Sequence, residues 1–215
     1  MKVIVFGSTG GTGRAVIAAL LAAGHEVTAF ARDVSALADI RAIRTVQGDA
    51  MRAADVAAAI PGHDAVVVSL GNSQNPFAML LGARRTTPPN VCEVGTRNII
   101  AAMKEAGTLR LLVVTAFGIG KASALPLAFR LFYRTVLREH MADKEKQEVL
   151  VKASALDWTL VQPVGLTDAK PTGDWLADTA GRIRRQQISR TDVAAFIVSR
   201  LEDGSCQRET VALSG

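Results

Sequence analysis

The chain has few of the residues that build disulfide frameworks or metal centres. Its 215 residues include two cysteines, Cys92 and Cys206, and three histidines. Two cysteines do not make a disulfide framework, and their scarcity favours a reducing compartment. The histidines are scattered, and no Cys/His cluster has the spacing of metal ligands, so we expect no metal site.

Long apolar runs are also missing. No segment approaches the roughly 20 apolar residues that a transmembrane helix needs. The chain begins with a predicted strand and not with a charged and then apolar signal segment. We therefore expect no membrane span and a cytoplasmic location.

Basic residues exceed acidic residues by a small margin, 25 to 20, for a formal net charge of +5. The lysines and arginines are spread along the chain, with the densest groups at residues 84–85 and 182–185. This distribution favours a solvated surface or an anionic small ligand over a nucleic-acid-binding face. We expect no nucleic-acid partner, and make no prediction of the oligomeric state.

A glycine-rich segment near the start is the most informative motif. Residues 2–6 form a β-branched apolar run that predicts a buried strand, and residues 14–21 predict a helix that ends near Gly24. Between them, glycines let the backbone approach a pyrophosphate at the helix N-terminus, where N–H groups and the helix dipole favour anions. The predicted cofactor-binding residues of this turn are Gly7, Ser8, Thr9, Gly10, Gly11, Thr12 and Gly13.

The spacing of these glycines narrows the class of site. Gly7, Gly10 and Gly13 lie three residues apart, unlike the G-x-G-x-x-G pattern of dehydrogenases with two full nucleotide-binding halves. No Lys-Ser or Lys-Thr pair follows them, which excludes a nucleoside-triphosphate loop. The alternative interpretation is a glycine-rich turn that binds nothing.

Apolar strands and helices alternate along the rest of the chain. The patterns predict strands at residues 26–31, 43–47, 65–70, 111–115, 158–162 and 210–213, and helices at 51–60, from 88 or 90 to 107, and 191–201. Ser189 and Asp192 are predicted to cap the last helix. Continuous apolar strands between helices indicate a parallel sheet covered on both faces. We predict one α/β domain over residues 1–215, a Rossmann-type doubly wound parallel sheet.

Ligands of such sheets bind outside the carboxyl ends of the strands. In this chain small or polar residues follow every predicted strand, as an extended cofactor requires. After the glycine turn, the residues at the strand ends are Arg32 and Asp33; Gly48, Asp49 and Ala50; Leu70, Gly71 and Asn72; Thr115, Ala116 and Phe117; and Pro163 and Val164.

Arg32 bears on which nicotinamide cofactor is bound. Chains that prefer NAD usually have an acidic residue at the end of the second strand, bonded to the ribose 2′-hydroxyl, whereas Arg32 stands there in this chain. A guanidinium group can hold a 2′-phosphate through two parallel hydrogen bonds. We predict NADP(H) in preference to NAD(H). Asp33 follows immediately, and its competing role is the N-cap of a short segment over residues 35–39.

In this order, the motifs resemble the NmrA-like NAD(P)-binding group of the atypical short-chain dehydrogenase/reductases, in particular its flavin reductase and biliverdin-IXβ reductase branch. The resemblance covers nearly the whole chain. It rests on residues 6–13, 31–33, 48–49, 53–56, 62–66, 95–104, 156–163 and 188–194.

The resemblance implies roles for the residues at the strand ends. It implies that the glycine turn holds the pyrophosphate and that Arg32 holds the 2′-phosphate. It further implies that Asp49 and Ala50 contact adenine, Leu70 and Gly71 the adenosine ribose, Thr115 and Ala116 the nicotinamide side, and Pro163 and Val164 the carboxamide.

Two features depart from the pattern of this group, and a third departs from that of the wider superfamily. Relatives often have serine at the position of Ala116 and arginine at the position of Gln162. The Tyr-x-x-x-Lys pair of the better-known members of the superfamily is absent, because the single tyrosine, Tyr133, is followed four residues later by Leu137. We therefore do not expect oxidation of ordinary alcohols by the Tyr-Lys route, and the resemblance does not identify the substrate.

Two functions from different classes follow. The first is an NAD(P)H-dependent reductase that passes hydride to an aromatic, anionic acceptor of the flavin, tetrapyrrole or quinone type. The alternative is a non-catalytic NADP(H)-binding sensor. Lys144 is the one candidate for contact with the nicotinamide ribose or the substrate, and otherwise it is a solvated lysine with Glu148 one turn later.

The substrate pocket is expected to form from residues 73–90 and 118–142, which follow the fourth and fifth strands. Arg130, Arg134 and Arg138 repeat every four residues beside an apolar face. This stripe fits an anionic substrate, a partner, a membrane surface or simply a solvated helix face. The predicted pocket residues are Asn72, Phe117, Phe129, Tyr133 and Lys144.

Overall fold

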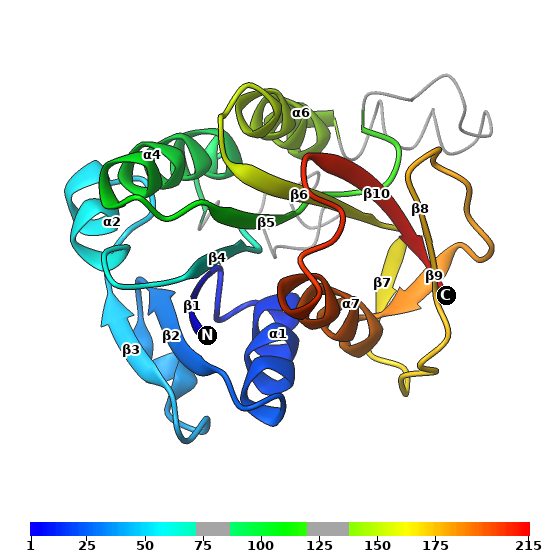
Figure 1. Ribbon diagram of the computed structural model, residues 1–215, viewed down its shortest axis with the longest axis horizontal. Helices are drawn as coiled ribbons and strands as arrows, with labels where there is room; N and C mark the ends of the chain where they lie inside the picture. Colours follow the sequence, from blue (N-terminus) through cyan, green and yellow to red (C-terminus); the bar gives the residue numbers. More distant parts are fainter. Residues whose placement is uncertain (72–86, 120–137) are drawn as a thin grey trace, which may run out of the picture.

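The computed structural model describes residues 1–71, 87–119 and 138–215. Figure 1 shows a twisted central sheet between two layers of helices. The strands are β1 (Lys2–Phe6), β2 (Glu26–Ala31), β3 (Arg44–Gln47), β4 (Ala65–Val68), β5 (Arg110–Val114), β6 (Asp157–Pro163), β7 (Gly165–Thr167), β8 (Leu176–Asp178), β9 (Gln187–Ser189) and β10 (Glu209–Ser214). The helices are α1 (Gly11–Ala22), the 3-10 helix η1 (Val34–Leu37), α2 (Ala53–Ala59), α4 (Val91–Ala106), α6 (Arg138–Lys152) and α7 (Arg190–Glu202).

Within the described part of the chain, the main sheet has eight strands in the order β3-β2-β1-β4-β5-β6-β10-β8. All neighbouring pairs are parallel except β8, which runs antiparallel to β10. The chain starts in the middle, builds outward through β2 and β3, and then returns to pair β4 with β1. This confirms the predicted doubly wound sheet, and the reversal of strand order at β1 and β4 is where such sheets bind ligands.

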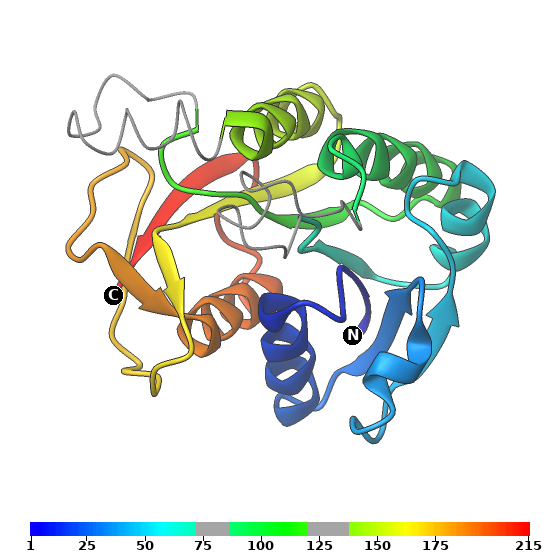
Figure 2. The same cartoon turned by 180° about the vertical axis from the view of Figure 1, so that it is seen from behind.

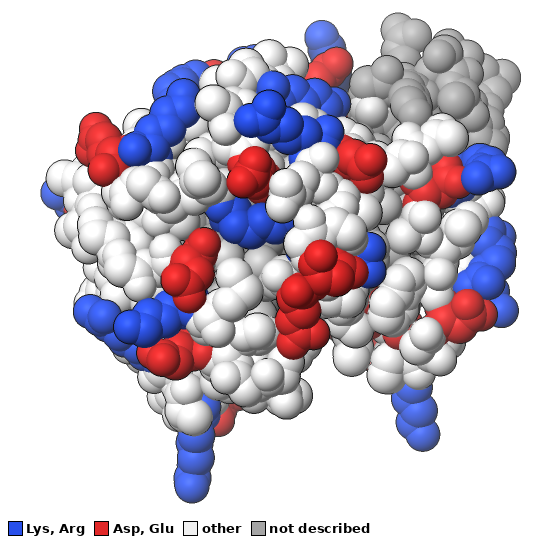
Figure 3. All heavy atoms as spheres, in the orientation of Figure 1, with Lys and Arg blue, Asp and Glu red and all other residues white. Residues whose placement is uncertain are grey.

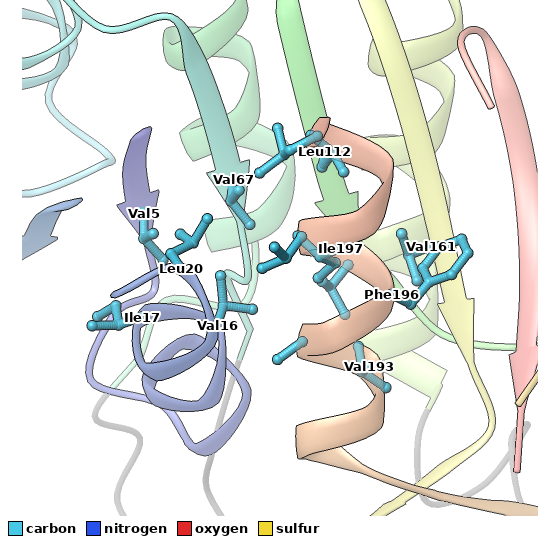
Figure 4. Close-up of a cluster of buried hydrophobic side chains, with 14 of the residues drawn as sticks. Val5, Val16, Ile17, Leu20, Val67, Leu112, Val161, Val193, Phe196 and Ile197 are labelled. Atoms are coloured by element: carbon cyan, nitrogen blue, oxygen red, sulfur yellow. The ribbon is translucent and has the colours of Figure 1, made fainter. Parts of the chain in front are cut away.

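Helices cover both faces of this sheet, as predicted. Helices α1 and α7 lie side by side on one face, and α2, α4 and α6 lie on the other (Figures 1 and 2). Figure 4 shows side chains of α1 and α7 meeting between the helices and the sheet, Leu20 and Ile197 among them. Both are fully buried, and truncation of such a leucine to alanine typically destabilises a core by about 2–5 kcal/mol. This packing holds the two helices in a fixed relation, which matters for the site below.

Three strands were not predicted from the sequence. Strands β7, β8 and β9 have three residues each, too few to show a period of two. Strands β7 and β9 form a separate small parallel sheet. The chain then passes directly from β9 into α7, whose predicted cap is confirmed, because the Ser189 hydroxyl accepts a 2.9 Å hydrogen bond from the Asp192 N–H.

The cap of α4 comes from a distant part of the chain. Asn90 precedes this helix, but its side chain makes no cap hydrogen bond. Instead the buried Asp143 carboxylate of α6 accepts hydrogen bonds from the N–H groups of Cys92 and Glu93, both at 2.9 Å. An acidic group at a helix N-terminus satisfies unpaired N–H groups and the helix dipole together. The interaction fixes α6 against the carboxyl edge of the sheet.

Charge is mixed on the surface that Figure 3 shows, where Lys and Arg alternate with Asp and Glu. None of the helices in the described ranges combines the length and hydropathy that crossing a bilayer would require. The described residues also contain no group of three or more His, Cys, Asp or Glu placed to hold a metal ion.

Candidate functional site

A cavity of about 280 Å³ lies at the carboxyl ends of the first four strands. It brings together residues that the sequence places far apart. Its lining includes Gly7, Thr9, Gly10 and Gly11 of the glycine turn, Arg32 after β2, Gly48, Asp49 and Ala50 after β3, Leu70 and Gly71 after β4, and Thr87, Pro88 and Val91 at the start of α4. Most of the residues predicted for the adenosine end of a cofactor therefore share one cavity.

Two glycines of the turn are required by the protein's own packing. Gly7 has φ +78°, a backbone conformation that favours glycine, and a Cβ there would lie 2.3 Å from the Ser69 carbonyl oxygen. A Cβ on Gly13 would lie 2.1 Å from the Gly7 carbonyl oxygen. These two residues let β1, the turn and α1 pack closely, whatever the turn binds.

Gly10 is different. Its φ is −74°, which any residue adopts, and the nearest atom to a Cβ at this position would be the Gly7 carbonyl oxygen at an ordinary 3.4 Å. Neither the backbone conformation nor the packing requires glycine here. The open space lies on the cavity side, at the N-terminus of α1, so Gly10 fits the close approach of a ligand.

The N-terminus of α1 suits an anion. Its first turn contains no acidic residue, and Gly10 supplies no side-chain cap, so the leading N–H groups and the positive end of the helix dipole face the cavity without an internal carboxylate. Thr9 is exposed beside them. The Ser8 hydroxyl is buried and donates a 2.8 Å hydrogen bond to the Phe30 carbonyl oxygen, so this side chain anchors the turn to β2.

Arg32 lines the cavity at the end of β2, whereas Asp33 is occupied elsewhere. The Asp33 carboxylate accepts hydrogen bonds from the Ser35 hydroxyl at 2.6 Å and the Ser35 N–H at 2.9 Å. These bonds lower the pKa of Asp33 below its usual range. Asp33 thus caps η1, which confirms the predicted N-cap, although the helical turn covers residues 34–37 and not 35–39.

The loop after β3 is held in place by hydrogen bonds on both sides. Asp49 receives a bond from the Met51 N–H at 3.0 Å and donates its own N–H to the Asp55 carboxylate at 2.9 Å. The Asn98 side chain of α4 donates to the Ala50 carbonyl oxygen at 2.9 Å. The predicted adenine contacts, Asp49 and Ala50, therefore lie on a preorganised wall of the cavity.

The predicted nicotinamide side lies at the ends of β5 and β6, which backbone bonds hold together. The Thr115 N–H donates to Val161 at 2.8 Å, the Phe117 N–H to Pro163 at 2.9 Å, and the Val164 N–H to Leu213 at 3.1 Å. Ala116 lies between the first two donors and has no polar side-chain atom. This part of the site is therefore built mainly from backbone.

A buried carboxylate accepts hydrogen bonds from the polar side chains at the ends of β5 and β6. Glu148 of α6 accepts hydrogen bonds from the Thr115 hydroxyl at 2.7 Å and the Gln162 amide at 2.8 Å, and pairs with Lys152 at 2.9 Å. Gln162, where relatives often have arginine, is thus a partner of Glu148. The Thr115 hydroxyl proton is committed to Glu148 and does not point to a ligand.

Lys144 is not a solvated lysine paired with Glu148, the alternative that its sequence position left open. Its ammonium donates to the carbonyl oxygens of Leu70 at 3.3 Å and Val114 at 3.2 Å, at the ends of β4 and β5. It lies 4.0 Å from where a Cβ of Gly71 would be. The Asp143 cap joins α6 to the start of α4, and on the same helix Lys144 lies between the ends of β4 and β5.

A small hollow beside Lys144 contains residues that were not predicted from the sequence. Cys92, His140 and Asp143 line it together with Gly71. The thiol of Cys92 contacts the Leu70 carbonyl oxygen, and burial raises its pKa to about 12, so it is a neutral thiol and a poor nucleophile. The spacing of His140 and Lys144, one helical turn apart, was the available signal for His140.

Several predicted residues lie outside the described parts of the chain. They are Asn72, Phe129 and Tyr133, with most of the expected pocket segments 73–90 and 118–142. Phe117 is described and packs partly buried against the core beneath α7.

Comparison with known proteins agrees with this geometry. The sequence is 28% identical over 210 residues to an uncharacterised chloroplastic protein of Arabidopsis thaliana, an alignment that covers 93% of this chain and 71% of the relative. It is similar in structure to the anaerobillin reductase ChuY of Escherichia coli O157:H7, with a TM-score of 0.80 and 23% identity over 100% of this chain and 97% of that one.

A second solved structure of similar fold is a short-chain dehydrogenase/reductase of Veillonella parvula in complex with NADP, with a TM-score of 0.80 and 15% identity over 100% of this chain and 94% of that one. At these identities the structural likeness shows the fold alone. The sequence model of the NAD(P)H-binding family, in contrast, matches residues 7–204, from the glycine turn to the end of α7. The protein belongs to the NAD(P)H-binding family.

Proposed function

We propose that the protein is an NADPH-dependent reductase that passes hydride to an aromatic, anionic acceptor. The observation that carries the proposal is the single cavity shared by the open Gly10 turn, Arg32, the Gly48–Ala50 loop and Gly71. When bound there, the nicotinamide cofactor supplies the hydride chemistry, and the protein binds and orients it.

The adenosine end supports the proposed preference for NADPH. Arg32 is proposed to hold the 2′-phosphate, since Asp33, the only acidic residue beside it in the chain, is committed to capping η1. A guanidinium group forms short, charge-assisted bonds to phosphate. The NADP complex of the Veillonella parvula neighbour is consistent with this choice.

The residues at the ends of β5 and β6 support the proposed class of acceptor. Ala116 offers no hydroxyl, and the Thr115 hydroxyl is donated to Glu148, so these two residues supply no proton donor to a carbonyl substrate. Flavins, tetrapyrroles and quinones are good hydride acceptors that need less acid assistance. Lys144 supplies a fixed positive charge at this edge, which favours an anionic acceptor. Residues 73–90 and 118–142 are proposed to complete the pocket.

The same observation at Ala116 and Thr115 favours a second candidate, a sensor that binds NADP(H) without turnover. The two candidates differ in one measurable property. NADPH oxidation, followed by absorbance, would be tested with FMN, biliverdin and a soluble quinone, with a Gly10→Val variant as the control for cofactor-dependent turnover.

Turnover with any of these acceptors, lost in Gly10→Val, supports the reductase and refutes the sensor. Tight NADPH binding with no turnover on any acceptor class supports the sensor. A wild-type protein that binds neither NADPH nor NADH contradicts both candidates.

A further inference from the structure

Arg190, the first residue of α7, lies against the glycine turn from outside the cavity. A Cβ on Gly11 would be 3.0 Å from its Nε, 3.1 Å from its Cδ and 3.6 Å from its Cζ. Helices α1 and α7 pack side by side (Figure 4), and these distances show that their first residues, Gly11 and Arg190, meet. The guanidinium group of Arg190 therefore borders the N-terminus of α1.

The electrostatics of this position are unfavourable in the absence of an anion. A cation is destabilised near a helix N-terminus, and Arg190 lies near two, its own and that of α1. Asp192 is the acidic residue in the first turn of α7, and it is buried and bonded to Ser189, Thr172 and Gly173.

The ion pair of Arg190 does not remove this problem. Its partner is Asp168 at 2.6 Å, whose side chain is 85% exposed, whereas that of Arg190 is 27% exposed. Ion pairs with one partner so exposed contribute little to stability. Arg190 has a second contact, because its Nε and Cδ lie against Gly11, so loss of the exposed Asp168 partner would leave the guanidinium beside the glycine turn.

We propose that Arg190 binds the pyrophosphate of the cofactor, completing a phosphate site whose other donors are the N–H groups at the start of α1. This rests on the proposed function, in that a nicotinamide dinucleotide occupies the cavity. The Arg32 guanidinium, at the other end of the cavity, then recognises the 2′-phosphate, and Arg190 recognises the part common to NADPH and NADH.

This division of roles gives a sharp test. Arg190→Met removes the charge and keeps the aliphatic stem over Gly11. Binding of NADPH and NADH would be titrated by cofactor fluorescence on the folded variant, verified by circular dichroism. We expect Kd to rise about tenfold or more, by the same factor for both cofactors. Arg32→Ala should raise Kd for NADPH alone.

Three further variants separate the charge from its surroundings. Arg184→Met is the matched control, because Arg184 also pairs with an exposed aspartate, Asp174, and is not among the nearest neighbours of Gly11; its Kd should equal that of the wild type. Asp168→Asn leaves the guanidinium in place and should bind at least as tightly as the wild type. Arg190→Lys keeps the charge but loses the planar guanidinium group, and should give an intermediate Kd. This variant provides the test if Arg190→Met does not fold.

Each alternative role has its own outcome. An unchanged Kd in Arg190→Met, with or without a higher KM for an acceptor, overturns the proposal, and so does a loss confined to NADPH. An equal loss in Asp168→Asn would show that the ion pair acts as a structural brace, which also overturns it. If the wild type binds neither cofactor, the proposed function fails together with this inference; if the wild type binds and Arg190→Met binds equally well, only the inference fails.

Discussion

Gly10 and Gly13 belong to one turn, but alanine at each should have opposite consequences. At Gly13 the new Cβ would meet the Gly7 carbonyl oxygen at 2.1 Å, about 1 Å closer than real Cβ atoms approach backbone. At Gly10 it would lie at an ordinary 3.4 Å from the same oxygen. The first substitution should therefore affect stability, and the second should affect cofactor binding.

The magnitudes follow from these distances. In Gly13→Ala, better helix propensity contributes about 1 kcal/mol, but a clash with fixed backbone lies at or beyond the upper end of the roughly 1–3 kcal/mol for overpacking, for a net loss of about 2 kcal/mol or more. For a chain of this length that lowers Tm by at least roughly 4–8 °C. In Gly10→Ala, Tm should change little, because φ of −74° is compatible with alanine, although alanine is a poorer N-cap residue than glycine.

For cofactor binding, Gly10→Ala should have the larger direct effect. A methyl group on Gly10 displaces the phosphate from the N–H groups, and loss of one charge-assisted hydrogen bond, about 1.5–3 kcal/mol, raises Kd at least about tenfold. Thermal unfolding by circular dichroism and NADPH titration by fluorescence measure the two effects on the same samples. Wild-type affinity in a folded Gly10→Ala variant would refute the assignment of the phosphate site, and an unchanged Tm in Gly13→Ala would refute the packing argument.

Three other predictions follow from single contacts. Arg32→Ala should raise Kd for NADPH by the equivalent of about 1.5–3 kcal/mol and leave NADH unchanged; equal effects on both would remove the 2′-phosphate role. Asp143→Ala, which leaves the N-terminus of α4 uncapped, should lower the free energy of unfolding by about 1–2 kcal/mol in a denaturant titration. Burial alone would raise the pKa of Asp192, but hydrogen bonds from the N–H groups of Thr172 and Gly173 lower it overall, so its contribution to stability is present above the ordinary carboxyl pKa of about 3.9 and is lost as pH falls through the lower folded value. Asp192→Asn should therefore lower Tm at neutral pH and flatten its fall below about pH 4, and a Tm–pH curve parallel to that of the wild type would contradict this.

The sheet could be predicted because its strands are buried on both faces. Residues 65–68 and 111–114 are buried throughout, and such strands are continuous apolar runs with strand-forming residues. The glycine turn and Arg32 could be predicted because each depends on local sequence at the end of one strand. The three-residue strands β7 to β9 carry no such signal, since their pairing depends on which segments meet after the main sheet has formed.

The features that sequence could not predict are contacts between distant residues. The Asp143 cap joins residues about 50 positions apart, and without it nothing in the sequence says which face of α6 turns to the sheet. That orientation decides whether Lys144 is solvated or bonded to the strand ends. Likewise Arg190 reaches Gly11 only because α1 and α7 are neighbours on one face of the sheet.

Membership of the NAD(P)H-binding family says more about the adenosine end of the site than about the acceptor end. At the adenosine end, the glycine turn and the Gly48–Ala50 loop offer mainly backbone geometry to the cavity, and Arg32 adds one cation. At the acceptor end, Glu148 binds the Thr115 hydroxyl and pairs with Gln162, which stands where relatives often have arginine. A buried carboxylate needs such donors as hydrogen-bond partners, so these donors are not free to bind a substrate. NAD(P)H binding is therefore common to the family, whereas the acceptor of the proposed reductase is expected to depend on side chains particular to this chain.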